Sequence, residues 1–287
     1  RVVPREQWDA FECRVVANTE RLLRLFDETG LRATFFVLGW VAEREPSLVR
    51  SIAAQHHEIA CHGYWHRLVY QQSPAEFRED VRRAKDVLES LTGQRVLGFR
   101  APSFSIIRSC VWALDILAEE GFVYDASIFP IRHDRYGIPG APRHAHRVET
   151  RSSGTGGEGA TPLSLLEIPA STVRLGRMTL PVSGGGYFRL LPYAWTRWGI
   201  RRVNEREGQP VVFYLHPWEV DPEQPRLRGS RLSRFRHYRN LKKTEQRLRR
   251  LLEDFKFGPI ADTIGIASAR YPFVLEHAAA FGLSDAS

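Results

Sequence analysis

The sequence predicts an α/β fold built on parallel strands, either open as a sheet or closed as a barrel, and three observations lead to it. Stretches with apolar residues at helical spacing alternate with short, continuous apolar runs rich in β-preferring residues. Polar residues of catalytic types follow the ends of several of these runs. The chain has 287 residues, of which 43% are hydrophobic and 11% aromatic, so it can bury a substantial core. Because strands that alternate with helices pair in parallel, the pattern favours the α/β class.

The first half of the chain carries the clearest alternation. Glycine follows three of its predicted helices, at Gly30, Gly93 and Gly121, and proline opens two, at Pro46 and Pro74. The helices are expected over residues 15–29, 46–55, 74–92 and 110–120, and the strands over residues 33–38, 57–61, 95–99 and 122–124.

The second half breaks this rhythm and then resumes it. The Gly- and Ser-rich residues 151–159 predict a flexible surface loop. The run 183–188 is also rich in glycine but lacks the Lys-Ser/Thr of a phosphate-binding loop, which favours a tight turn at the rim of a barrel. The remaining elements are strands over residues 165–169 and 211–215, and helices over residues 190–207 and 244–255. We expect one domain over residues 1–257, followed by a looser tail over residues 258–287.

Candidate catalytic side chains come just after the ends of predicted strands. They are His62 and His66 after the second strand, Arg100 after the third, Asp125 after the fourth and His216 after the last. The carboxyl ends of parallel strands meet at one rim, where α/β barrels build their active sites. We therefore expect these side chains to converge on one pocket.

The two histidines have the spacing of a metal site. His62 and His66 lie four residues apart, so their imidazoles can face one ion if the loop places them on one side. A divalent metal on two histidines and a carboxylate, with positions open for water, supports hydrolysis. The alternative is a chance pair, because the chain contains ten histidines.

Hydrolysis of an amide or ester also needs an acid and a base. His216 is the candidate acid, and a carboxylate such as Asp125 would fix its tautomer. Arg100 would hold a carboxylate base in place. Each residue also has a purely structural alternative. His216 could be hydrogen-bonded within the core, Asp125 could cap a turn or a helix, and Arg100 could form a salt bridge.

The chain is basic, and much of its positive charge is concentrated in one run. The formal net charge is +8 and the pI is near 9.7. Between residues 226 and 250 there are eleven Arg or Lys and one acid, Glu245. Such a run can bind phosphate or an anionic polymer. A solvated helix face with its loop is the interpretation that we favour, so no nucleic-acid partner is expected.

Four motifs, in order along the chain, resemble those of the NodB-like polysaccharide deacetylases (carbohydrate esterase family 4). They are His62-Gly63-Tyr64-Trp65-His66, Arg100-Ala101-Pro102-Ser103, Tyr124-Asp125-Ala126-Ser127-Ile128-Phe129 and Tyr214-Leu215-His216-Pro217. Further segments, at residues 33–40, 100–106, 184–189 and 235–238, resemble the subgroup encoded with bacterial exopolysaccharide and exosortase (PEP-CTERM) loci. The resemblance covers about residues 8–257.

The resemblance implies a distorted (β/α) barrel with fewer than eight strands, and the removal of N-acetyl groups from an amino-sugar polysaccharide. It implies Zn²⁺ or another divalent metal on His62 and His66. The residue matching Arg100 orients the catalytic base, and the residue matching Asp125 supports the acid, which matches His216.

The resemblance also implies aromatic side chains that line a sugar-binding groove. Phe129 matches a position where the broad family more often has Trp. Tyr187 and Trp218 are weaker candidates for the same groove, and a role in the core is an equal alternative for each.

One departure concerns the family's first motif, an Asp-rich strand end that supplies the base and the third metal ligand. No counterpart occurs before Ala33, and Asp9 is not assigned as a ligand. We expect that the chain starts downstream of its own first strand, or that the protein lacks its base. In the second case it would be a carbohydrate-binding relative without activity. A less favoured alternative is a binder of anionic polymers or nucleic acids through residues 226–250.

The cysteine content indicates in which cellular compartment the protein is expected. Cys13, Cys61 and Cys110 are odd in number and far apart, which argues against a disulfide framework. Free cysteines suit a reducing cytoplasm, the location that we expect, whereas an envelope location would suit an exopolysaccharide substrate. No run of 18 apolar residues occurs, so no membrane-spanning segment is expected. The sequence does not indicate an oligomeric state.

Overall fold

The computed structural model describes residues 5–150, 163–227, 229–265 and 276–277. The chain forms two compact units, each built from two separate segments. The first unit comprises Arg1–Leu31 and Val182–Phe257, and the second comprises Arg32–Pro181 and Gly258–Ser287. The predicted loop at residues 151–159 lies outside the described residues.

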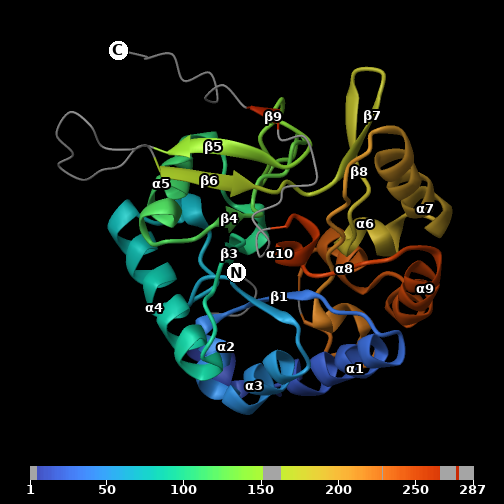
Figure 1. The fold of residues 1–287 in the computed structure, drawn as a ribbon. Helices are drawn as coiled ribbons and strands as arrows, with labels where there is room; N and C mark the ends of the chain where they lie inside the picture. The colour runs from blue at the N-terminus through green and yellow to red at the C-terminus, as the bar shows by residue number, and fades with distance from the viewer. Residues whose placement is uncertain (1–4, 151–162, 228, 266–275, 278–287) are drawn as a thin grey trace. The chain divides into compact units, whose positions relative to one another are not determined.

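The second unit contains the main sheet (Figure 1). Its strands, in spatial order, are β1 (Thr34–Val37), β2 (Glu58–Cys61), β3 (Gly98–Phe99), β4 (Tyr124–Asp125), β6 (Leu163–Glu167), β5 (His146–Thr150) and β9 (Glu276–His277). The first five are parallel to one another, and β5 runs antiparallel to β6. A separate hairpin joins β7 (Thr172–Leu175) to β8 (Met178–Pro181). The predicted α/β class is therefore confirmed, and the described strands form an open, barrel-like sheet without closing it.

Helices alternate with the parallel strands as the sequence predicted. They are α2 (Gly39–Arg44), α3 (Pro46–Ala54), α4 (Pro74–Thr92), α5 (Trp112–Glu119) and α10 (Ile260–Thr263), with short 3-10 turns at Val69–Gln71, Pro102–Phe104 and Arg108–Cys110. The limits of α4 follow from its caps. Ser73 Oγ accepts a hydrogen bond from the Glu76 N–H, and the Glu76 carboxylate accepts one from the Ser73 N–H. Gly93 ends the helix in the left-handed conformation, at φ 66°.

The core beside the sheet requires close backbone packing at Gly98. A Cβ added there would lie 1.9 Å from Cζ of Tyr124, which is fully buried. The Tyr124 hydroxyl donates to Glu58 Oε1 at 2.8 Å, and Glu58 Oε2 accepts from the Ala261 N–H at 3.1 Å. The start of the predicted tail thus packs against β2, while the predicted division into domain and tail stays a prediction.

The first unit is mainly helical. It contains α1 (Val15–Glu28), α6 (Gly185–Leu190), α7 (Tyr193–Arg201), α8 (Arg231–Tyr238) and α9 (Leu241–Asp254), with 3-10 turns at Arg5–Ala10 and Pro217–Val220 and a π-helical turn at Arg202–Arg206. Arg14, just before α1, donates to both carboxylate oxygens of Asp221 at 2.6 and 3.0 Å. Asn18 adds a third hydrogen bond to Asp221, at 3.1 Å. This cluster joins the two segments of the unit.

One predicted strand of this unit is wrong. Residues 211–215 form no strand, and only Tyr214 forms a bridge, to Gly184. Gly184 has φ 106°, and a Cβ there would lie 2.0 Å from the Tyr214 carbonyl oxygen. The run is half-buried, so its apolar residues pack against neighbouring elements without forming a ladder of hydrogen bonds. Among the described residues, no helix combines the length and the apolar character needed to cross a membrane.

Candidate functional site

In the second unit, His62 follows β2 and is held by the chain that follows β3. Its Nδ1 lies 2.6 Å from the Arg100 carbonyl oxygen. Because a carbonyl only accepts, Nδ1 carries the proton and Nε2 carries the lone pair that a metal ligand needs. The His66 ring lies with its centroid 5.3 Å from that of His62, at an interplanar angle of 68°. The structure therefore brings the predicted pair together.

The loop that carries this pair depends on Asp80, a residue of α4 that sequence reasoning missed. Its carboxylate accepts hydrogen bonds from the N–H groups of Tyr64, at 2.7 Å, and Trp65, at 3.1 Å. Gly63 has φ 73°, and a Cβ there would lie 2.7 Å from Asp80 Oδ2. Burial raises the pKa of Asp80, while these two N–H groups lower it. Asp80 thus fixes the backbone between His62 and His66.

Arg100 and Asp125 lie at the ends of the neighbouring strands. Phe99, the last residue of β3, pairs with Asp125 of β4. Arg100 is buried, donates from Nε to the Ala126 carbonyl at 3.0 Å, and lies over the Phe36 ring at 4.2 Å. Its side chain is therefore fixed beside the strand end that carries Asp125.

Asp125 is fully buried and shares its surroundings with a second carboxyl group. It accepts from the Ser127 hydroxyl at 2.5 Å and from the Ser127 N–H at 3.2 Å. Glu167, at the end of β6, pairs in register with Asp125 and accepts from the Ile128 N–H at 3.0 Å. Burial, and then the neighbouring Asp125 charge, raise the pKa of Glu167 well above its usual range and so favour its protonated form. Glu167 also follows a predicted strand, a signal that could have identified it.

In the first unit, His216 is held by Glu219. The His216 side chain is 51% exposed, and its Nδ1 lies 2.7 Å from Glu219 Oε1. Glu219 is buried, and its Oε2 accepts from Nε of the buried Arg189 at 2.6 Å. Burial would raise the pKa of Glu219, but His216 and Arg189 together hold it below its usual range. The ionised Glu219 thus keeps the proton on Nδ1 and directs Nε2 of His216 outward.

Sequence reasoning had named Asp125 as the partner that supports His216. The structure provides Glu219 for this purpose within the same unit. The role of Asp125 toward His216, and the convergence of His216 with the second unit's residues, stay predictions. Glu219 lies three residues after His216, a spacing that was visible in the sequence.

The three predicted groove aromatics lie in different surroundings. Phe129 is fully buried and packs on Phe104 and Tyr136, with ring centroids 5.2 and 5.8 Å away. This is the packing of a core residue. Trp218 is half-buried, and Tyr187 is half-buried in α6. Their roles in a groove stay predictions.

Whether the described residues suit a metal ion can be judged from the ligand atoms that they offer. His62 has the tautomer of a metal ligand, and the His66 ring lies beside it. Within the described ranges, no group of three or more His, Cys, Asp or Glu side chains is placed to hold an ion. The described residues therefore fit two positions of a metal site.

Two family models match the chain. Residues 8–118 match "Polysaccharide deacetylase", and residues 126–265 match "Domain of unknown function (DUF3473)". The chain is 34% identical over 110 residues to the peptidoglycan deacetylase-like protein FGM2 of Gibberella zeae, which covers 38% of this chain and 32% of that protein. It is 29% identical over 100 residues to the chitooligosaccharide deacetylase of Bradyrhizobium sp., which covers 35% of this chain and 43% of that protein. The chain thus spans less than half the length of these curated relatives.

Solved structures agree with the fold. A Mycobacterium smegmatis structure assigned to the polysaccharide deacetylases has a TM-score of 0.55 at 23% identity, covering 88% of this chain and 77% of that one. Puue allantoinase has a TM-score of 0.55 at 20% identity, covering 90% of this chain and 74% of that one. At these identities the likeness shows the fold alone. Residues 8–118 thus match the polysaccharide deacetylase model, and the solved structures add a likeness of the fold.

Proposed function

We propose that this protein removes N-acetyl groups from an amino-sugar polysaccharide. The observation that carries the proposal is the fixed tautomer of His62 beside His66, in a segment that matches the polysaccharide deacetylase model. The relatives' names support the substrate class, because one is a chitooligosaccharide deacetylase and another is peptidoglycan deacetylase-like. In the reaction the amide C–N bond breaks, the acetyl carbon takes the hydroxyl of water, and the sugar amine takes a proton.

His62 and His66 are the proposed metal ligands. A bound Zn²⁺ or similar ion would polarise the acetyl carbonyl and lower the pKa of a water molecule. The protein's own contribution is to hold both rings in place, through the Arg100 carbonyl at His62 and through Asp80 at the loop between them. Arg100 is proposed to orient a carboxylate base, as in the family that the sequence resembles.

His216 is the proposed acid. With its proton on Nδ1 held by Glu219, a second proton on Nε2 is available to the leaving amine. The negative charge of Glu219 stabilises the doubly protonated ring, and Arg189 keeps Glu219 ionised. The resemblance to the subgroup encoded with exosortase loci further suggests a place in exopolysaccharide biosynthesis.

The natural protein that carries this chain should be incubated with N-acetylated chito-oligosaccharides and Zn²⁺, and the released acetate measured. His62→Ala should abolish metal retention. His216→Ala should keep the metal but lower turnover by ~10²–10⁴, the usual value of a positioned acid. A fully active His216→Ala variant would disprove the acid assignment. Glycan binding with no acetate release by the wild type would instead support a carbohydrate-binding protein without activity.

A further inference from the structure

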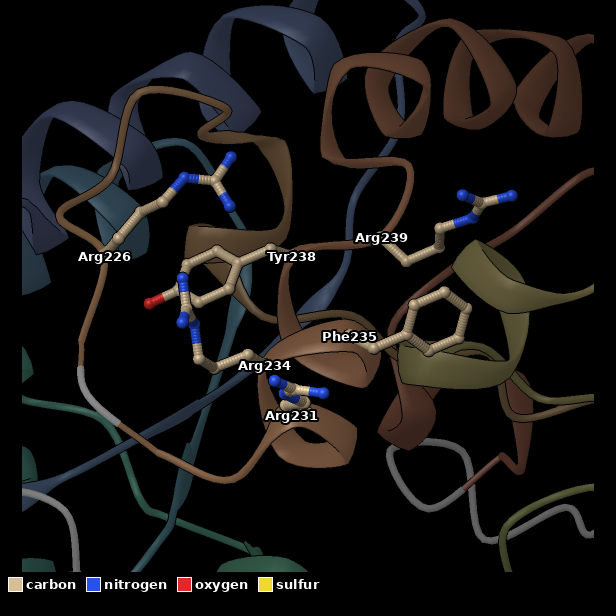
Figure 2. A pocket seen from close by; sticks show the side chains of 6 residues that line it. All are labelled: Arg226, Arg231, Arg234, Phe235, Tyr238 and Arg239. Carbon is tan, nitrogen blue, oxygen red and sulfur yellow. The ribbon is translucent and has the colours of Figure 1, made fainter.

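Six side chains on the first unit surround a hollow of about 350 Å³. Four are arginines and two are aromatic: Arg226, Arg231, Arg234, Phe235, Tyr238 and Arg239. Figure 2 shows the four guanidinium groups arranged around the two rings. All but Arg226 belong to α8 or follow it directly. We call this hollow the arginine pocket.

The arginine pocket is strongly positive and open to solvent. Its four arginines are exposed, and Phe235 is 53% exposed. No ion pair within 4.0 Å joins any of the four to a carboxylate in the part of the chain that the structure describes. Elsewhere in the same unit, Arg14, Arg21, Arg189 and Arg249 all have carboxylate partners. The pocket therefore presents positive charge that no carboxylate of the described residues neutralises through an ion pair.

The walls of the arginine pocket are preformed. The Tyr238 hydroxyl accepts from the Leu227 N–H at 2.8 Å and donates to the Pro225 carbonyl at 3.1 Å, which joins α8 to the preceding loop. The Arg226 guanidinium lies 4.8 Å from the centroid of the Tyr238 ring, and that of Arg239 lies 5.4 Å from the centroid of Phe235. Such contacts restrict the guanidinium groups before any ligand binds, which reduces the entropy cost of binding.

A row of rings connects the arginine pocket to the candidate acid within the first unit. Tyr238 lies 4.6 Å from His237, His237 stacks on Trp218 at 4.1 Å, and Trp218 stacks on His216 at 5.6 Å, all measured between ring centroids. Burial lowers the pKa of His237 and so disfavours a positive charge on this ring. These ring contacts place the pocket and His216 in one packed series of side chains within the first unit.

We propose that the arginine pocket binds a carboxylate-bearing sugar of the same polysaccharide whose acetamido group is hydrolysed, so that the enzyme prefers acidic N-acetylated polymers. The proposal rests on the proposed function. A planar guanidinium forms paired hydrogen bonds with a carboxylate, and the aromatic rings supply contacts for the sugar itself. The volume of the hollow lies in the range of small-ligand sites, whereas backbone binders of nucleic acid use extended positive grooves.

Two hexasaccharides distinguish the acidic sugar from the acetamido group. A hyaluronan hexasaccharide alternates glucuronate with N-acetylglucosamine, and chitohexaose is its uncharged counterpart. Isothermal titration calorimetry on the wild type should show at least about tenfold tighter binding of the hyaluronan hexasaccharide at low salt. Arg231→Gln/Arg234→Gln should weaken that binding about tenfold, equivalent to about 1.4 kcal/mol, and leave chitohexaose binding within twofold.

The matched control is Lys242→Gln/Lys243→Gln. It removes the same charge from exposed positions of the same basic run, outside the pocket. It should change hyaluronan binding by less than about twofold, because charges away from the ligand are screened. An equal loss of affinity in both double variants would show that binding depends only on the overall charge of the basic run, and would overturn the proposal. A wild type without preference for the acidic hexasaccharide would overturn it too.

Two further measurements distinguish failure of the pocket proposal from failure of the proposed function. Single-stranded DNA that binds more tightly than the hyaluronan hexasaccharide, through the same arginines, would show a nucleic-acid site and reject the sugar. Acetate release from chitohexaose should be unchanged in Lys242→Gln/Lys243→Gln, which leaves the pocket intact. If the wild type releases no acetate but keeps its preference for the acidic hexasaccharide, the proposed function fails and the pocket stands. If acetate release is normal and the preference is absent, only the pocket fails.

Discussion

Replacing Glu219 by glutamine should lower the rate of the proposed deacetylation. Glu219→Gln keeps the shape of the side chain and an oxygen that can accept from His216 Nδ1, but removes the negative charge 2.7 Å from that atom. The weaker hydrogen bond no longer fixes the tautomer and orientation of the imidazole that is proposed as the acid. We therefore expect the proton transfer to the leaving amine to slow down.

The size of the effect follows from the distance and the exposure. Opposite unit charges about 4 Å apart attract each other by about 1 kcal/mol in water and about 4 kcal/mol at an effective dielectric constant of 20. Because the His216 side chain is 51% exposed, the lower part of this range applies, about 1–2 kcal/mol. A barrier higher by that energy lowers kcat by about tenfold or somewhat more. We therefore expect kcat to fall by about 10- to 100-fold, as when the partner that orients a functional histidine is lost.

The assay is acetate release from a chito-oligosaccharide at a fixed pH, with the melting temperature of each variant measured alongside. Glu219→Gln leaves Arg189 without its buried counter-charge and should cost about 3 kcal/mol of unfolding free energy, so all rates are taken well below the lowered melting temperature. Glu219→Asp, which keeps the charge, should give an intermediate kcat. A folded Glu219→Gln variant with the kcat of the wild type would refute the reasoning.

Three further substitutions test the second unit. Asp80→Asn removes a carboxylate that holds the loop between the proposed metal ligands His62 and His66, and should weaken Zn²⁺ retention by about 10- to 100-fold, measured by equilibrium dialysis. Gly98→Ala places a Cβ against the buried Tyr124 ring and should lower the unfolding free energy by about 1–3 kcal/mol or more, measured by urea denaturation. In the wild type, folding favours protonated Glu167, so this group's stabilisation is full below the usual carboxyl pKa of 4.5 and is lost as the pH rises through the raised value. The unfolding free energy of Glu167→Gln should therefore fall less than that of the wild type between pH 5 and pH 8.

For each of these three substitutions, one outcome would contradict the prediction. Asp86→Asn removes a similar charge from an exposed position of α4, and an equal effect on Zn²⁺ retention would show that Asp80 has no special role. Gly258→Ala puts a Cβ in ordinary contact, 3.5 Å from Thr263 Oγ1, and should be nearly neutral. If Gly98→Ala matched it, the close packing would be disproved. A Glu167→Gln variant with the same pH dependence as the wild type would mean that Glu167 is ionised in the folded protein.

The sequence predicted best those elements whose limits are set by local chemistry. Helix α4 begins and ends where the sequence predicted, because Ser73, Pro74 and Gly93 define its ends without help from the rest of the fold. The run 211–215 was expected to be a strand on its apolar character. Apolar residues predict burial, but a strand also needs a neighbour with which to pair, and here only Tyr214 has one.

The candidate site residues also differ in how far the sequence could predict their surroundings. That His62 and His66 lie side by side after a strand was predictable from their spacing, and their role as metal ligands stays a prediction. Asp80 was not, because its function depends on a contact between α4 and a loop 15 and 16 residues earlier, and nothing in its own helix marks it. Glu219 lay within reach of sequence reasoning, three residues beyond His216, but its burial and its pairing with Arg189 arise from tertiary structure.

The salt bridge between Arg14 and Asp221 spans 207 positions of the chain and has a consequence for biosynthesis. Helix α1 leaves the ribosome before the partner that anchors it, which is translated about ten to forty seconds later at typical elongation speeds. Throughout that interval the apolar stripe of α1, with Leu22, Leu25 and Phe26, has no completed unit to cover it. Nascent chains of this protein should therefore depend on chaperones that shield early helices, and slow, long-range closure should limit the folding rate of the first unit.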